Sequence, residues 1–338
     1  MDSRELVLST LEFRNHTGIA PVDLWSLPWA SMYQADWLNR VKTDFPNDIV
    51  TCPVGQTVPS PTVGDPYDGN DYVDEWGVLF QSIQPGAIGE VKNPIVTGED
   101  EWDTSRVRFP DERLHIDRDA VNRFCAGESR FVMGGCCPRP FERLQFLRGT
   151  QELYIDLMLE PAGMKEFLQK LHGYFLKEME AWAKTDVDAL MYMDDAGSQK
   201  ALLINPEVWR QYFKPCYKDY IDLAHAYGKK CFMHSDGYIL SIYPDLIEMG
   251  LDALNSQLFC MGLDELEKYA GKITFWGEID RQNLLPHGTT EDIDRAVRDV
   301  RSRLWKNGGC IAECEFGPGA KGENVYRVFK TWRDLAAE

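Results

Sequence analysis

The stretch KKCFMHSDG, residues 229–237, is a short apolar run that ends in His234, Ser235 and Asp236. This pattern is typical of a strand in a parallel sheet whose carboxyl edge carries polar groups. An amphipathic segment precedes it. That segment starts at Asn205-Pro206-Glu207, where Asn can cap, Pro fits the first turn and Glu complements the dipole, and it ends at Gly228. The sequence therefore predicts one helix over 205–228 followed by a strand.

The same alternation of strand and helix continues along the chain from about residue 119. A long helix is predicted over 161–184, where apolar residues recur every three or four positions. The strands are RFVMGG (130–135), VDALMYMDD (187–195), LDALNSQ (251–257), KITFWGEID (272–280) and CIAECEFG (310–317). Repeated βα units of this kind predict a single (β/α)8 TIM barrel, an α/β fold with its active site at the carboxyl ends of the strands.

In the first third of the chain, strands and helices alternate less regularly. TGIAPVDLW (17–25) and NDIVTCP (47–53) are predicted strands, whereas residues 59–81 predict turns and a hairpin. We therefore expect one domain over 1–338. In it, residues 1–118 would form the first barrel unit and an elaborated N-terminal lid or extension, and residues 119–338 the regular repeats.

Charge and composition limit the range of partners and compartments. The formal charge of −18 disfavours binding to nucleic acid. Charged residues or Gly interrupt every apolar run before it reaches the length of a membrane span, roughly 20 residues. The nine cysteines are odd in number and scattered, and the first residues lack the apolar run of a secretory signal. These features predict a protein of a reducing, cytoplasmic compartment with no nucleic-acid or membrane partner.

Four strand-end residues could bind a metal: His234, Asp236, Glu278 and Cys314. Imidazole, carboxylate and thiolate are ligands that suit Zn²⁺, with one position left for substrate. Each residue ends a predicted strand, so a barrel would bring them to one rim. The alternative is that His234 is an ordinary rim residue and that Cys314 is a small buried side chain, as most free cysteines are.

Three segments resemble the uroporphyrinogen decarboxylase superfamily: HSDGYILSIYPDLIEMGLDALNSQ (234–257), FWGEIDRQNLLPHGTTEDI (275–293) and GGCIAECEFGPG (308–319). The segments 17–25 and 47–53 resemble its first two strands, so the similarity covers most of the chain. The resemblance implies the (β/α)8 barrel predicted above. It also implies one of two activities, decarboxylation of a tetrapyrrole or methyl transfer with a corrinoid protein.

The decarboxylase branch is disfavoured by the segment SLPWASMY (26–33), which has no arginine where that branch carries carboxylate-binding arginines. Asp48 does match the key aspartate of that branch, which makes it a candidate for substrate binding. The resemblance to the methyltransferase branch lies in a His-x-Cys pair followed by a distant second Cys. His234 matches the His and Cys314 the second Cys, whereas Asp236 stands in place of the first.

The third metal ligand is therefore open between Asp236 and Glu278, and Glu278 is favoured because it has a longer side chain on a different strand. His234, Glu278 and Cys314 are thus the expected Zn²⁺ ligands. A carboxylate in place of a thiolate makes zinc a harder Lewis acid, better suited to an ether oxygen than to a thiol. We therefore expect demethylation of a methoxylated, aromatic substrate, with the methyl group passing to the cob(I)alamin of a partner corrinoid protein.

The remaining candidate residues follow from this activity. Asp195 and Asp236 are expected as acids that assist catalysis. Asp194 precedes Asp195 in a strand, so the two should point to opposite sides, with only one facing the mouth. The residues expected to bind substrate are Trp25, Trp29, Asp48, Asp194 and Gln257, with Tyr33 and Trp76 as further aromatic candidates.

Other functions remain open from the sequence alone. They are a methylcobalamin:thiol methyltransferase that acts on a thiol such as coenzyme M, a decarboxylase of another tetrapyrrole, and a corrinoid or porphyrin carrier without catalysis.

Overall fold

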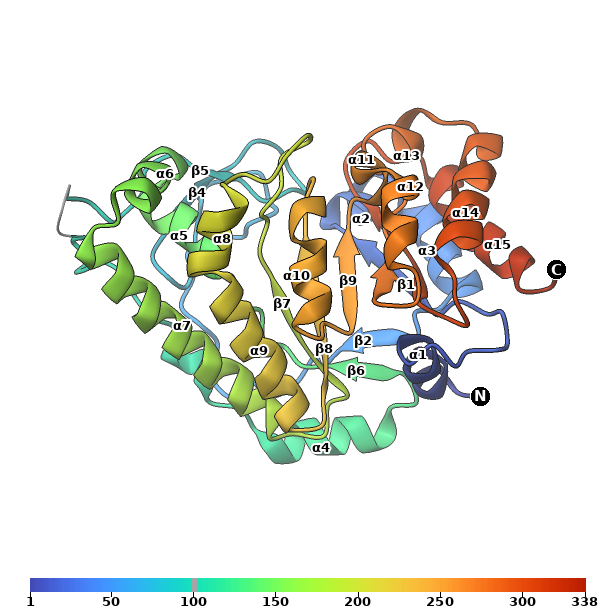
Figure 1. Cartoon of the computed structure of the whole chain (residues 1–338), viewed down its shortest axis with the longest axis horizontal. Helices are drawn as coiled ribbons and strands as arrows, with labels where there is room; N and C mark the ends of the chain where they lie inside the picture. Colours follow the sequence, from blue (N-terminus) through green and yellow to red (C-terminus); the bar gives the residue numbers. More distant parts are fainter. Residues whose placement is uncertain (99–101) are drawn as a thin grey trace.

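The computed structural model describes residues 1–98 and 102–338, and its centre is a sheet of eight parallel strands (Figure 1). The order in the sheet is β1-β11-β10-β9-β8-β7-β6-β2, which follows the order along the chain, as in a (β/α)8 barrel. The predicted barrel is confirmed. Its strands are β1 (Val22–Ser26), β2 (Ile49–Thr51), β6 (Phe131–Met133), β7 (Ala189–Met193), β8 (Lys230–Ser235), β9 (Ala253–Ser256), β10 (Thr274–Trp276) and β11 (Cys310–Phe316).

The barrel is closed between β1 and β2 partly by side chains. The Asp48 N–H donates to the Val22 carbonyl at 2.7 Å, and the Asp48 carboxylate accepts from the Val22 N–H at 2.7 Å. The Asn47 side-chain oxygen accepts from the Leu24 N–H at 2.9 Å. Two residues just before β2 thus hold the first strand in place.

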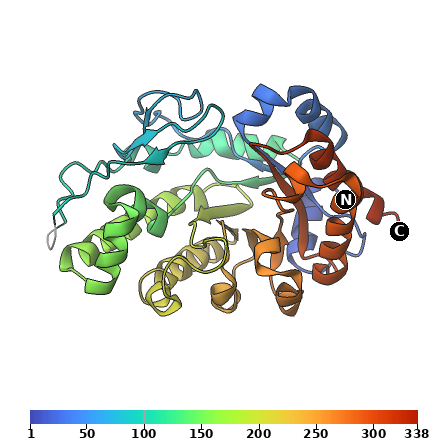
Figure 2. The same ribbon diagram turned by 90° about the horizontal axis from the view of Figure 1, so that it is seen from above.

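Helices surround the sheet, and both chain ends lie on the same side of the molecule (Figures 1 and 2). The longer helices are α1 (Ser3–Leu11), α3 (Ala35–Asp44), α4 (Arg118–Gly127), α5 (Pro140–Arg148), α6 (Thr150–Leu159), α7 (Ala162–Ala183), α9 (Lys214–Ala226), α14 (Thr290–Leu304) and α15 (Gly322–Leu335). The shorter ones are α2 (Pro28–Tyr33), α8 (Pro206–Tyr212), α10 (Tyr243–Glu248), α11 (Leu258–Met261), α12 (Leu263–Leu266) and α13 (Leu284–His287), with 3-10 turns η1 (Asp111–Leu114), η2 (Leu240–Ile242) and η3 (Glu267–Tyr269). None of the helices within the described residues is long and apolar enough to cross a membrane.

The helix predicted over 205–228 is divided in two, α8 and α9, at Phe213. The cause is Pro215 in the first turn of α9, because proline has no N–H to continue the hydrogen bonds of the preceding helix. The long helix predicted over 161–184 is confirmed as α7.

The interior of the barrel is a small apolar cluster that α1 closes at one end. Val7 and Leu11 of α1 pack against interior residues of the strands, among them Phe131, Phe232 and Trp276. A second, larger cluster joins the outer faces of the strands to the helices. The two clusters show whether a strand residue points into the barrel or outward to the helices, and this determines which candidate residues can reach the site.

A separate antiparallel sheet lies between β2 and β6 in the sequence, and it contains β3 (Tyr72–Val73), β4 (Leu79–Gln81) and β5 (Glu90–Val91). The hairpin predicted in this region is confirmed by the pairing of β3 with β4. Figure 2 shows this segment, in cyan, on the side of the molecule away from the two chain ends.

Candidate metal and active site

His234 lies at the end of β8 with its ring orientation fixed by Asn255 of β9. The Asn255 amide nitrogen donates to the Trp276 carbonyl at 2.6 Å and to Glu313 at 3.0 Å, so its Oδ1 is left as an acceptor. That oxygen lies 2.6 Å from His234 Nδ1. Nδ1 therefore carries the hydrogen, and in the neutral ring the lone pair is on Nε2, the atom available to a ligand.

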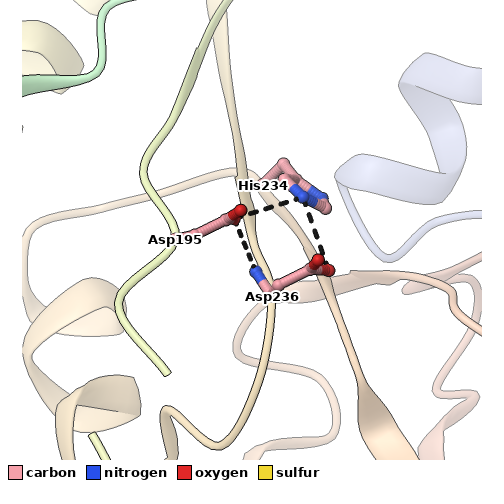
Figure 3. A group of neighbouring side chains, drawn as sticks. All are labelled: Asp195, His234 and Asp236. Atoms are coloured by element: carbon pink, nitrogen blue, oxygen red, sulfur yellow. Dashed lines mark hydrogen bonds and ion pairs between the residues drawn. The ribbon is translucent and has the colours of Figure 1, made fainter. Parts of the chain in front are cut away.

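His234 Nε2 faces two carboxylates (Figure 3). Its distances are 3.5 Å to Asp195 Oδ1 and 3.6 Å to Asp236 Oδ1. The Asp236 N–H also donates to Asp195 Oδ1 at 2.9 Å, which fixes the two acids relative to each other. Donor atoms of all three residues lie within 4.8 Å of one another. Burial, and next the charge of Glu142, raise the pKa of Asp195 to about 6.

Arg281, in the turn after β10, pairs with three carboxylates at this rim. It forms an ion pair with Asp236, and it lies 3.4 Å from Glu278 and 2.9 Å from Glu315. Gln257 completes the surroundings of Asp236: its amide nitrogen is 3.5 Å from Asp236 Oδ1, and its oxygen accepts from the Gly237 N–H at 3.1 Å. Arg281 was not among the predicted site residues; its position three residues after Glu278 was the available signal in the sequence.

Cys314 is not part of this site, which corrects the expected ligand set. Its neighbour Glu313 points into the barrel, where it accepts from Asn255. Adjacent residues of a strand point to opposite faces, so Cys314 points outward. It belongs to the apolar cluster between strands and helices, and burial raises the pKa of its thiol well above the ordinary value. The alternative considered above, a small buried side chain, is the correct one for Cys314.

Glu278 does lie at the rim but outside the group of donor atoms that contains His234. It is buried, its nearest charged partner is Arg281, and burial raises its pKa to about 8. Of the two candidates for the third ligand, the structure therefore places Asp236, and not Glu278, beside His234.

Asp194 and Asp48 do not line the candidate site, because each accepts hydrogen bonds from another part of the fold. Asp194 points away from the barrel mouth and accepts from the Phe141 and Glu142 N–H groups at 2.9 and 2.6 Å, which caps the amino end of α5. The expectation that Asp194 and Asp195 diverge is confirmed. Asp48 precedes β2 and bonds to Ser3 and Val22, at the strands' amino ends and thus at the end of the barrel opposite the site.

The two candidate tryptophans lie in different surroundings. The Trp25 ring is 5.2 Å from the His234 ring and 5.1 Å from that of Trp276, so Trp25 forms a wall of the site. Trp29 packs instead against Tyr33, at 5.3 Å between ring centroids, in contact with the loop at Gly86.

Two buried acids inside the barrel were also missed from the sequence. Asp23 accepts from the indole N–H groups of Trp276 and Trp25 at 2.9 and 3.1 Å, and burial raises its pKa to about 7. Glu313 packs against Gly277, where a side chain would meet its carboxylate. The sequence signal for both was an acidic residue within a mostly apolar strand.

The chain belongs to the uroporphyrinogen decarboxylase (URO-D) family, whose family model matches residues 80–335. The resemblance found in the sequence is confirmed. Comparison with curated protein sequences gives no significant match.

The barrel fold is shared with a solved structure of a methyltransferase. A methyltransferase from Methanosarcina mazei superimposes with a TM-score of 0.63 at 14% identity, covering 99% of each chain. A B12-independent methionine synthase from Shewanella sp. W3-18-1 has a TM-score of 0.43 at 12% identity, covering 65% of this chain and 64% of its own. An endo-β-1,4-xylanase from Gloeophyllum trabeum has a TM-score of 0.44 at 10% identity, covering 95% and 99%.

Proposed function

We propose that the chain is a zinc-dependent methyltransferase. In this proposal it removes the methyl group of a methoxylated aromatic compound and passes it to the cob(I)alamin of a separate corrinoid protein. The observation that carries the proposal is the position of His234 Nε2, which lies 3.5 Å from the Asp195 carboxylate and 3.6 Å from the Asp236 carboxylate at the mouth of the barrel. Membership of the URO-D family and the fold shared with a methyltransferase are consistent with it.

The donor set fits a catalytic zinc. Such a site commonly has three protein ligands and one open position, with ligand bonds of about 2.0–2.2 Å. In tetrahedral geometry these bonds separate neighbouring ligands by about 3.3–3.5 Å. The distances of 3.5 and 3.6 Å from His234 Nε2 to the two carboxylates are close to this value. The second requirement, a partner for the other ring nitrogen, is met by Asn255.

The expected ligands are therefore His234, Asp195 and Asp236. When bound, zinc would supply a Lewis acid for the oxygen that departs when an aryl ether loses its methyl group. Asn255 fixes the tautomer of His234, and Trp25 provides an apolar wall beside the His234 ring. Arg281 and Gln257 hold the Asp236 carboxylate. Two carboxylates and one imidazole form a hard ligand set, which favours an oxygen over a thiolate as the fourth ligand.

The test is a panel of methyl donors mixed with the zinc-loaded protein and reduced cobalamin or its corrinoid protein. Methyl-Co(III) is followed by absorption. We expect methylation from methoxybenzenes and not from methanol, methylamines or methyl thioethers. Methylation from amines or thioethers alone would eliminate the ether assignment. Consumption of methylcobalamin by a thiol, with no donor active, would favour the thiol methyltransferase instead.

A further inference from the structure

A cavity of about 600 Å³ lies between the antiparallel sheet β3–β5 and the helices α5 and α7. Its volume is in the range of small-molecule sites, which are commonly about 300–1,000 Å³. Five aromatic side chains contribute to its lining: Tyr72, Trp76, Phe80, Phe146 and Phe175. They come from the sheet and from both helices, so the cavity offers ring faces on more than one side.

Two residues of the lining, Arg139 and Glu142, lie on the side of the cavity toward the end of β7. The Arg139 guanidinium lies 3.0 Å from the sulfur of Met193, the last residue of β7 and only two residues before Asp195. Glu142 pairs with Arg139 at 2.9 Å. Arg139 thus connects the lining of the cavity to the carboxyl end of β7, the strand that leads into Asp195.

The charges of the lining do not favour an anionic ligand. Each of its three guanidinium groups already has a carboxylate partner: Arg143 pairs with Asp74 at 2.6 Å, Arg139 with Glu142, and Arg113 with Glu178 at 2.7 Å and Glu75 at 3.3 Å. With Glu90, five carboxylates line the cavity against three guanidinium groups. Even with the buried Glu178 protonated, four carboxylates and three guanidinium groups line the cavity, so a benzoate would meet a lining of net negative charge.

We propose that this cavity binds the ring of the methyl donor, and that the donor is an uncharged aromatic ether in preference to a methoxybenzoate. The inference rests on the proposed function and specifies its substrate class. The aromatic side chains supply ring contacts, and the paired arginines leave no free cation for a carboxylate.

The experiment is isothermal titration calorimetry at pH 7 with 2-methoxyphenol and with 4-hydroxy-3-methoxybenzoate, which differ by one carboxylate. Wild type should bind the phenol at least about tenfold more tightly. Phe146→Ala should weaken binding of the phenol about tenfold, because it removes one ring contact. The matched control is Phe259→Ala, which makes the same change in a different cavity, the one beside Glu278, and it should bind as wild type does.

A second pair of variants tests the charge argument by a gain of binding. Glu142→Gln leaves Arg139 without its carboxylate partner, whereas Glu75→Gln leaves Arg113 paired with Glu178. Both remove one negative charge from the lining. We expect the benzoate to bind at least about fivefold more tightly to Glu142→Gln than to Glu75→Gln, a gain that a merely damaged cavity would not produce.

Three results would overturn the proposal: tighter binding of the benzoate than of the phenol by wild type, loss of binding in Phe259→Ala but not in Phe146→Ala, and no binding of either compound at millimolar concentration. Equal benzoate affinity in the two glutamine variants would overturn the charge argument. Because the titration needs no cobalamin, a ring that binds here without methyl transfer would contradict only the proposed function. Methyl transfer from methoxyphenol that Phe146→Ala leaves unchanged would contradict only the cavity assignment.

Discussion

His234 donates its Nδ1 hydrogen to Asn255 Oδ1 over 2.6 Å, and this single contact determines that Nε2 is the free nitrogen of the ring. Asn255 cannot rotate its amide without losing its bonds to the Trp276 carbonyl and to Glu313. The asparagine thus holds one tautomer of the histidine in place, as the outer partner of a metal-binding histidine does.

Replacement of Asn255 by Ala should therefore weaken zinc binding about 10–100-fold, because the ring loses the partner that orients it. Zinc affinity is measured by competition with a chromogenic chelator. Asn205→Ala is the control: it removes a helix-capping asparagine of α8, at a cost of about 1 kcal/mol in stability, but has no contact with the site. Equal zinc affinity in wild type and Asn255→Ala would show that this contact does not support a metal.

Cys314→Ala should keep the full zinc content, since the thiol points into the apolar layer outside the barrel. The expected effect is a loss of about 1–2 kcal/mol in the free energy of unfolding, from the small cavity left behind. Elemental analysis of Cys314→Ala and of Asp236→Asn, side by side, distinguishes the two ligand sets. Loss of zinc in Cys314→Ala with retention in Asp236→Asn would contradict the site described here.

The sequence predicted the barrel and the rim because strand ends are marked by polar residues after apolar runs. It could not predict that Cys314 points outward. In β11 every residue except Glu315 is buried, so the alternation that reveals the two faces of a half-exposed strand is missing. Asp48 was expected to bind substrate because it matches the key aspartate of the decarboxylase branch, but it precedes the three-residue strand β2 and bonds to Val22 at the amino end of β1. The contacts of Arg281 depend on a turn, whose geometry no periodicity encodes.

Glu313→Gln should reduce the loss of stability at high pH. Burial, and next the charges of Glu278 and Asp23, raise the pKa of Glu313 well above its ordinary value. The folded state then holds a proton that the unfolded chain releases above about pH 4.3, so the Glu313 contribution to stability falls as the pH rises above this value, up to the pKa of the folded state. Glutamine keeps an acceptor for Asn255 but carries no charge.

Urea unfolding of the metal-free proteins at pH 5 and pH 8 measures this difference. The midpoint of wild type should fall more between the two pH values than that of Glu313→Gln, while Glu278 and Asp194 contribute similarly to both. An identical fall in the two proteins would mean that Glu313 does not titrate in this way.

The protein should not decarboxylate uroporphyrinogen, although it belongs to the family that takes its name from that reaction. The helix α2, directly after β1, has the sequence PWASMY and presents no arginine to the acidic side chains of a porphyrinogen. Anaerobic incubation with uroporphyrinogen, followed by chromatography of the porphyrins, tests this. Formation of coproporphyrinogen would assign the protein to the other branch of the family.

The most direct test of the central claim is the initial rate of methyl-Co(III) formation from 2-methoxyphenol and cob(I)alamin. It should be measured for zinc-loaded wild type and for His234→Ala under identical conditions. We expect turnover by wild type and a loss of at least about 100-fold in His234→Ala, because the substitution removes the one nitrogen donor of the proposed zinc site. An unchanged rate in His234→Ala would contradict the account.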